Sequence, residues 1–68
     1  MNLIDARGLS CPEPVIMIRK AMMSKEGAYQ IVVDNPASRE NVTRYAQHQG
    51  YQVNCTEKDG EYTLSITK

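Results

Sequence analysis

The stretch that decides the fold covers residues 3–22 and reads LIDARGLSCPEPVIMIRKAM. It begins as a short apolar segment and changes, after the turn-prone pair Arg7-Gly8, into an apolar pattern of helical period. Two prolines, Pro12 and Pro14, lie where the helical pattern begins. Proline is tolerated in the first turn of a helix because the N–H groups there have no intrahelical acceptor. The stretch therefore predicts a strand, a tight loop and a helix that begins at about Pro12.

The rest of the chain continues the alternation of strands and helices. The expected strands cover residues 2–6, 29–34, 51–58 and 61–67. The expected helices cover residues 12–25 and 36–49. Each helix is followed by a glycine that can end it, Gly27 and Gly50. Asn35 is predicted to cap the second helix, and Asp59-Gly60 to form the turn of the closing hairpin.

The apolar residues of these elements predict two packed layers. The first helix has an apolar stripe of Val15, Ile18, Ala21 and Met22, and the second has Val42, Tyr45, Ala46 and Gln49. The last two strands alternate, with Tyr51, Val53, Cys55, Tyr62, Leu64 and Ile66 on the inward face. Strands with one apolar face are covered on that face only. We therefore expect an α+β fold, a two-layer sandwich of order β-α-β-α-β-β with both helices on one face of the sheet.

The first crossover predicts where a functional site lies. A right-handed connection through the first helix makes the first two strands parallel neighbours, so the loops after them emerge at the same edge. Open α/β sheets place ligands at such an edge. Cys11 lies in the first loop, and residues 34–37 form the second.

Length, charge and hydropathy exclude several classes of function. The 68 residues form one expected domain, 1–68, that buries only about 60% of the surface of its unfolded chain. Eight Lys and Arg balance eight Asp and Glu, so no general attraction to nucleic acid or to an acidic membrane exists. No apolar run approaches a membrane span, and the start lacks the pattern of a signal peptide. These features predict a cytoplasmic domain.

The predicted start of the first helix activates the cysteine. Either Cys11 caps the helix, or Ser10 does with Glu13 as the third residue of a capping box. In both registers the sulfur lies at the positive end of the helix dipole, which favours the thiolate and lowers the thiol pKa. A carboxylate at Glu13 opposes this effect, and Arg7 across the loop supports it.

The surroundings expected for Cys11 distinguish a carrier from a catalyst. The only histidine, His48, falls near the end of the second helix, where we interpret it as a surface residue, and no C-x-x-C pair is present. Two cysteines and one histidine also make no credible zinc site, so neither metal nor cofactor is expected. An exposed, activated sulfur without a base suits a carrier that one partner loads with a persulfide and another unloads. In the alternative reading, Cys11 is only a small filler at a helix start.

The same stretch resembles the TusA-like sulfur-carrier family, which includes SirA and YedF proteins. Its signature is a Cys-Pro-x-Pro motif preceded by an Asp and a Gly-Leu. The matching positions are Asp5, Gly8, Leu9, Cys11, Pro12 and Pro14. The segment 33–51 and the closing hairpin also look like the family, so the resemblance covers the whole chain.

The resemblance implies both a topology and a function. It implies a mixed four-stranded sheet of order 1-2-4-3 whose fourth strand is antiparallel to the others. It also implies a sulfurtransferase-like carrier that receives a persulfide on Cys11 from a cysteine desulfurase or similar donor. Its acceptor protein serves tRNA thiolation or cofactor assembly. The sequence of residues 33–53 is most similar to the YedF branch, which is linked with selenium metabolism. In that branch such a domain is often followed by a second one.

Two residues beside the cysteine have predicted supporting roles in addition to the motif positions Gly8, Pro12, Glu13 and Pro14. Asp5 is expected to brace the loop by accepting backbone N–H bonds. For Arg7, a solvated turn residue and an electrostatic neighbour of the persulfide remain equal alternatives.

The exposed side of the first helix is a candidate docking surface for partners. The stripe of Ile16, Arg19, Lys20 and Met23 is predicted to face water, apolar in the middle with a cationic rim. Scattered exposed apolar residues are the ordinary alternative.

Cys55 is expected to be a small buried residue rather than a second working thiol.

Two other classes of function remain possible from the sequence. The layout also resembles the C-terminal domain of translation initiation factor three, which suggests an RNA-binding module, but the zero net charge argues against direct nucleic-acid binding. A regulatory interaction module in which Cys11 is only structural is the other alternative.

Overall fold

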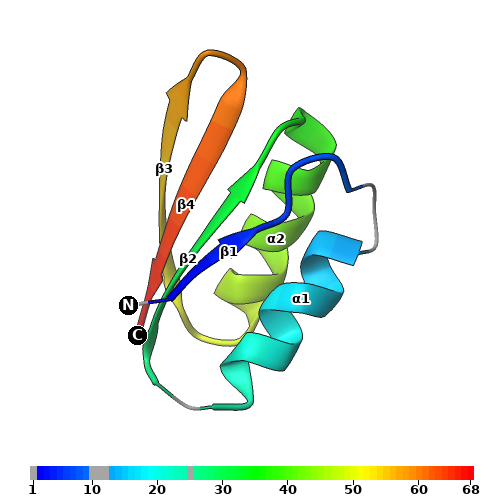
Figure 1. Ribbon diagram of the computed structural model, residues 1–68. Coiled ribbons are helices and arrows are strands. Elements are labelled where there is room, and N and C mark those ends of the chain that lie inside the picture. The colour runs from blue at the N-terminus through cyan, green and yellow to red at the C-terminus, as the bar shows by residue number, and fades with distance from the viewer. Residues whose placement is uncertain (1, 10–12, 25) are drawn as a thin grey trace.

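Four strands form one mixed sheet, and two helices lie together on one of its faces (Figure 1). The computed structural model describes residues 2–9, 13–24 and 26–68. Its elements are β1 (Asn2–Asp5), α1 (Glu13–Met22), β2 (Ala28–Val33), α2 (Pro36–His48), β3 (Gln52–Lys58) and β4 (Glu61–Thr67). The predicted two-layer α+β architecture is confirmed.

The strand order β1-β2-β4-β3 is the order that the family resemblance implies. β1 pairs in parallel with β2, with Asp5 opposite Val32. β4 is antiparallel to both of its neighbours, β2 and β3, and places Tyr62 opposite Val33. Because of these directions, the ends of β1 and β2 and the beginning of β4 share one edge of the sheet.

The core lies between the sheet and the helices and is made of aliphatic side chains and one tyrosine. Its buried members are Ala6, Ile18, Tyr29, Ile31, Val33, Val42, Ala46, Leu64 and Ile66. The opposite face of the sheet is more polar, and Gln30 Nε2 donates to Ser65 Oγ there at 3.4 Å. The alternation along the strands thus has the expected cause, one covered face and one wet face.

Local chemistry explains the start of α2 and the closing hairpin. Asn35 Oδ1 accepts from the Ser38 N–H at 2.7 Å, and Pro36 occupies the first helical position. Asp59 and Gly60 both have positive φ, 52° and 79°, as a two-residue type I′ turn requires. Both predictions are confirmed.

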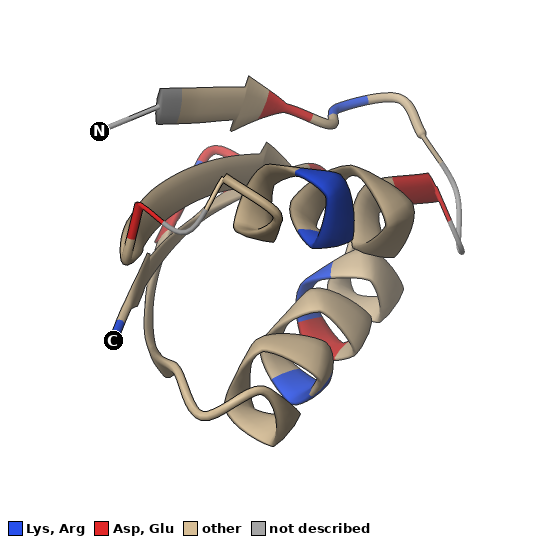
Figure 2. Ribbon diagram, turned by 90° about the horizontal axis from the view of Figure 1, so that it is seen from below, with Lys and Arg blue, Asp and Glu red and all other residues tan. Residues whose placement is uncertain are grey.

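The two helices are short and carry charges of both signs. α1 has 10 residues and α2 has 13, whereas a bilayer span needs about 20 apolar residues. Basic and acidic positions are interspersed along them (Figure 2). Of the helices that the described residues form, none has the length and apolar character needed to cross a membrane.

The end of α1 corrects the expected boundary at about Lys25, a residue outside those described. The helix ends at Met22. Ser24 explains the early end, because its N–H and its hydroxyl both donate to the Ala21 carbonyl, at 3.1 and 2.7 Å. Gly27, expected to stop the helix, instead has φ +83° directly before β2.

Cys55 corrects the expectation of a buried cysteine. It lies opposite Leu64 and thus on the helix-facing side of the sheet, as predicted, but its side chain is exposed. The reason is that β3 is an edge strand which α2 covers only in part. Cys55 borders a shallow hollow of about 400 Å³, whose other lining residues are Arg39, Glu40, Thr43, Arg44 and Gln47 of α2.

The packing of α1 predicts a difference between two isoleucines on the same helix. Ile18 is fully buried in the core, whereas Ile16 is half-buried and is not among the side chains packed against the core. We expect Ile18→Val to lower the free energy of unfolding by about 0.5–1.5 kcal/mol, since it leaves a methyl-sized void. Ile16→Val is the matched control and should lower it less. Urea denaturation of both variants measures this, and equal losses would contradict the packing described.

Candidate functional site

Segments from three parts of the chain meet at the edge where β1 and β2 end. The pairing of β1 with β2 continues one residue further, because the Ala6 N–H donates to the Val32 carbonyl at 2.9 Å. The loop after β1 begins there, and the loop after β2 begins at Asp34. Glu61, the first residue of β4, lies at the same edge. The topology therefore brings both predicted loops together.

A salt-bridge network fixes the beginning of the first loop. The Arg7 guanidinium donates to both carboxylate oxygens of Asp5, with Nε and Nη2 each at 2.9 Å. Asp5 Oδ1 also accepts the backbone N–H of Arg7 at 3.1 Å. A third branch runs from Arg7 Nη1 to Glu61 Oε2 at 3.3 Å. Asp5 thus braces the loop through a backbone N–H bond, as the sequence predicted.

A hydrogen bond between the two loops fixes the next residue. The Gly8 N–H donates to Asp34 Oδ2 at 2.8 Å, although 26 positions separate the two residues. Asn35 Nδ2 donates to the other oxygen of Asp34 at 3.3 Å. Gly8 has φ +79°, a conformation that L side chains rarely adopt. Leu9 follows, half-buried against the core. The loop is therefore held by a carboxylate from each strand end and by an apolar anchor.

The predicted sulfur site follows this anchor in the sequence. Cys11, Ser10 and Pro12 are outside the described residues, so the two capping registers remain predictions. Cys11 stands two positions after Leu9 and two before Glu13, with which α1 begins. Glu13 is exposed in the first turn of α1, and Pro14 is buried there.

The one cation among the groups that hold the loop is already paired. The side-chain and backbone hydrogen bonds from Arg7 lower the pKa of Asp5 from 3.8 to about 2. The same carboxylate, together with Glu61, raises the pKa of Arg7. The groups that hold the loop are three carboxylates, of Asp5, Asp34 and Glu61, and one guanidinium. Arg7 is therefore exposed in the turn and at the same time held in a salt-bridge network.

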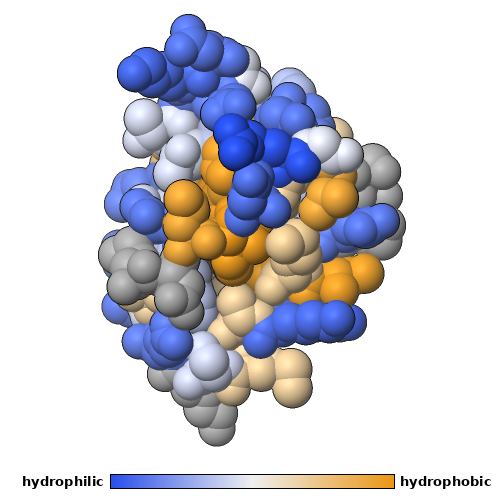
Figure 3. Space-filling model, in the orientation of Figure 1, coloured by the Kyte–Doolittle hydropathy of each residue, from blue (hydrophilic) through white to orange (hydrophobic). Residues whose placement is uncertain are grey.

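The candidate docking residues lie together on one side of α1. Arg19 and Lys20 are exposed, Met23 is 78% exposed, and Ile16 is half-buried. Apolar side chains gather over β1 and α1 in the view of Figure 3, with hydrophilic ones beside them. His48 is exposed in the last turn of α2, as expected.

Asp34 and Glu61 are site residues that the sequence reasoning missed. Asp34 has a recognisable signal, since it directly follows a strand predicted to be parallel to the first and to end at the same edge. Glu61 has no such signal in the sequence, because its position depends on the pairing of β4 with β2.

Within residues 2–9, 13–24 and 26–68, no three His, Cys, Asp or Glu side chains are grouped as a metal site requires.

Comparison with known proteins agrees with this geometry. A family profile described as "Sulfurtransferase TusA" matches residues 2–68. The chain belongs to the TusA family. Its TusA relatives include the "Sulfur carrier protein TusA" of Pseudomonas aeruginosa, 29% identical over 69 aligned positions that cover 97% of this chain and 87% of the relative. The protein of the same name from Pseudomonas entomophila is 29% identical over 68 positions, covering 96% and 85%.

A solved structure of similar sequence has the same fold. The crystal structure of a SirA-like protein from Desulfitobacterium hafniense superposes with a TM-score of 0.92 and 39% sequence identity. The match covers 98% of this chain and 96% of that one.

The Asp5–Arg7 network predicts a pH dependence of stability. Because the pKa of Asp5 is lower in the folded chain, about 2, than its ordinary 3.8, its contribution is complete above about pH 4 and is lost as the pH falls toward 2. Asp5→Asn should therefore flatten the change of melting temperature with pH in that window. Arg7→Gln, which keeps the carboxyl group but removes its donor, should do the same. Slopes equal to that of the unmodified protein would contradict the network.

The backbone of Gly8 predicts the effect of a side chain there. A Cβ at Gly8 meets no atom within 4 Å, so a substitution acts through the positive φ alone. Gly8→Ala should cost about 1–2 kcal/mol of unfolding free energy. Gly8→Asn should cost less, since Asn adopts this conformation more readily. Thermal unfolding of the pair checks this, and the reverse order would contradict the assigned backbone.

Proposed function

We propose that this protein is a sulfur carrier that holds sulfur as a persulfide on Cys11. The observation that carries the proposal is the TusA-family match over residues 2–68, a range that includes Cys11. The relatives named as sulfur carrier proteins support it, because they align over nearly the whole chain.

The proposed loading step is an exchange of sulfur between two cysteines. The Cys11 thiolate attacks the terminal sulfur of a persulfide on the donor. A new S–S bond forms on Cys11 while the donor's S–S bond breaks, and the donor cysteine leaves as a thiolate. The donor is a cysteine desulfurase or a similar enzyme, and no external oxidant is consumed. Unloading repeats the exchange with a nucleophile on the acceptor protein.

The start of α1 supports the reactivity that this step requires. The N–H groups of a first helical turn lack intrahelical acceptors and stabilise an anion beside them. The same groups favour a thiolate before loading and a persulfide anion after it. Because Arg7 is paired with Asp5 and Glu61, these N–H groups are the main stabilising influence that we assign to Cys11.

The partners in the proposal are proteins rather than nucleic acid or membrane. The balanced charge of the chain gives no general attraction to nucleic acid, and we assign the donor and the acceptor as proteins of the cytoplasm. The acceptor serves tRNA thiolation, cofactor assembly or selenium-related metabolism. The stripe of half-buried Ile16 and exposed Arg19, Lys20 and Met23 begins one turn after the start of α1, which places it within reach of a partner that loads Cys11. Replacement of Ile16 and Arg19 should then weaken transfer without lowering the melting temperature.

Intact mass spectrometry tests the carrier proposal with a matched pair of cysteine variants. The protein is incubated with a cysteine desulfurase and cysteine, and its mass is measured without reducing agent. The expected result is the added mass of one sulfur atom, kept in Cys55→Ser and absent in Cys11→Ser. Cys55 is a demanding control because it is also exposed. Sulfur on Cys55, or none on either residue with several donors, would contradict the proposal.

A further inference from the structure

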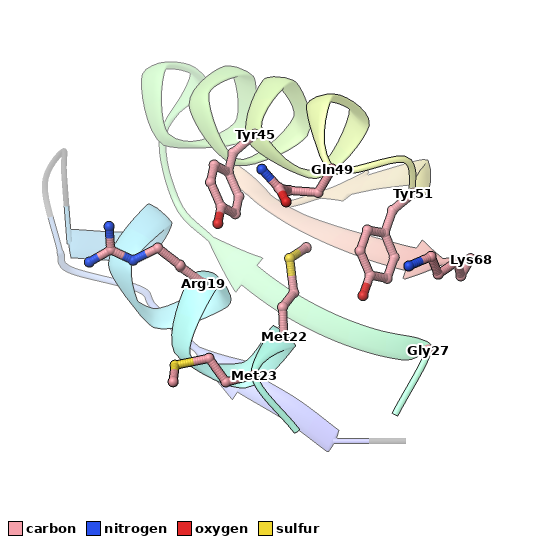
Figure 4. A pocket seen from close by; sticks show the side chains of 8 residues that line it. All are labelled: Arg19, Met22, Met23, Gly27, Tyr45, Gln49, Tyr51 and Lys68. Carbon is pink, nitrogen blue, oxygen red and sulfur yellow. The ribbon is translucent and has the colours of Figure 1, made fainter. Parts of the chain in front are cut away.

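A second surface feature reaches the end of the sheet opposite the edge where β1 and β2 end. It is a groove of about 520 Å³, which we call the distal groove. Its lining residues are Arg19, Met22, Met23, Gly27, Tyr45, Gln49, Tyr51 and Lys68. They come from the ends of both helices and from the residues next to the near ends of β2, β3 and β4 (Figure 4). The topology thus separates Gly27, Tyr51 and Lys68 from the loop edge by the length of the sheet, whereas Arg19 and Met23 also belong to the docking stripe of α1.

The apolar part of the distal groove has the composition of a binding surface. Met22, Tyr45 and Tyr51 point into the space between the helix ends and the sheet (Figure 4). Met23, 78% exposed, lies beside them. Methionine adapts its shape to irregular partners, and tyrosine offers a large ring with a polar tip. Both residue types are characteristic of protein interfaces.

The charged side chains that line the distal groove are both cationic. Arg19 and Lys68 lie on opposite sides of it, and none of its eight lining residues is acidic (Figure 4). In the described part of the chain, the ion pairs involve Arg7 and Arg44, which leaves Arg19 and Lys68 without a carboxylate partner. The nearby helix ends contribute about half a negative charge each, less than the two full cations. The groove therefore attracts a carboxylate.

The floor of the distal groove is held in place before any partner arrives. The Tyr51 ring meets the fully buried Tyr29 edge to face, with centroids 6.0 Å apart. Lys68 Nζ lies 5.1 Å from the centroid of the same Tyr51 ring. The Tyr29 hydroxyl in turn accepts the Glu26 N–H at 3.0 Å. A preorganised floor reduces the entropy lost on binding.

We infer that the distal groove binds a peptide segment of a partner protein, one that carries acidic side chains next to apolar ones. The methionines and tyrosines receive the apolar side chains, and Arg19 and Lys68 receive the carboxylates. The open shape suits an exposed chain segment better than an enclosed small molecule. This inference goes beyond the sulfur-carrier proposal, since binding here needs no sulfur on Cys11.

Nuclear magnetic resonance titration tests the inference on the whole unloaded protein. The probe is the peptide acetyl-Glu-Leu-Glu-Phe-Glu-amide, added at low salt to protein labelled with ¹⁵N and with ¹³C at the methionine methyl groups. The expected result is a set of shifts confined to the residues of the distal groove. A second peptide with Gln in place of each Glu should bind about tenfold more weakly or worse.

Two charge-reversal variants make the test specific. Arg19→Glu should weaken binding of the acidic peptide by about tenfold or more, because it reverses one of the two cations. Lys58→Glu changes the net charge equally but lies at the far end of β3, so it should leave the affinity within about twofold. A well-dispersed spectrum of each variant shows that the fold is kept.

The remaining outcomes separate the two proposals. Absent shifts, shifts centred elsewhere, or equal effects of the two variants would overturn the peptide inference. Shifts of the same residues with protein concentration alone would also overturn it, since the occupant would then be a second copy of this chain. Peptide binding by a protein that no donor can load would leave the inference intact and remove only the carrier proposal.

Discussion

The parallel pairing of β1 with β2 is the constraint on which the rest of the structure depends. It forces the chain to cross over through α1, and it brings the loops after both strands to one edge. Only with this pairing does Asp34 reach the Gly8 N–H, at 2.8 Å. The loop between β1 and α1 is then held on both sides of its turn, by Asp5 and by Asp34. The sheet thereby sets the position of the first described part of this loop, which precedes Cys11 in the sequence.

Much of this arrangement follows from the sequence because it rests on local chemistry. Helical and strand periodicities, the Asn35 cap and the Asp59-Gly60 turn are short-range signals, and each of them was predicted. The bracing role of Asp5 was also predicted, because it needs only a carboxylate two residues before a backbone N–H. The strand order came from the family resemblance, since periodicity says nothing about which strands pair.

The residues and boundaries that the sequence did not predict correctly depend on contacts that leave no periodic pattern. The alternation of apolar residues predicted the face of the sheet on which Cys55 lies, but it did not predict that Cys55 is exposed. The alternation shows which face a side chain is on, and it does not show how far α2 covers the edge strand β3. The Arg7–Glu61 contact joins residues 54 positions apart and depends on the pairing of β4 with β2. The end of α1 depends on a single serine hydroxyl that competes for a carbonyl. None of these has a periodic signature in the sequence.

The two ends of the molecule have different chemistry. The loop edge combines three carboxylates and one guanidinium in bonds that hold a backbone in place. The distal groove combines methionines, tyrosines and cations without an acidic side chain. In a sulfur carrier this separation allows a partner to be held at one end while the sulfur is exchanged at the other. It also means that substitutions in the groove and in the loop should have separable effects.

We propose that the first turn of α1 lowers the pKa of the Cys11 thiol below that of a free cysteine, so that a larger fraction is thiolate at neutral pH. The most direct measurement is the rate of alkylation of Cys11 by iodoacetamide as a function of pH, in the Cys55→Ser protein so that a single thiol reacts. We expect a titration midpoint clearly below about 8.5, the pKa of a free cysteine. A midpoint at or above that value, or a thiol that alkylates only after unfolding, would contradict it.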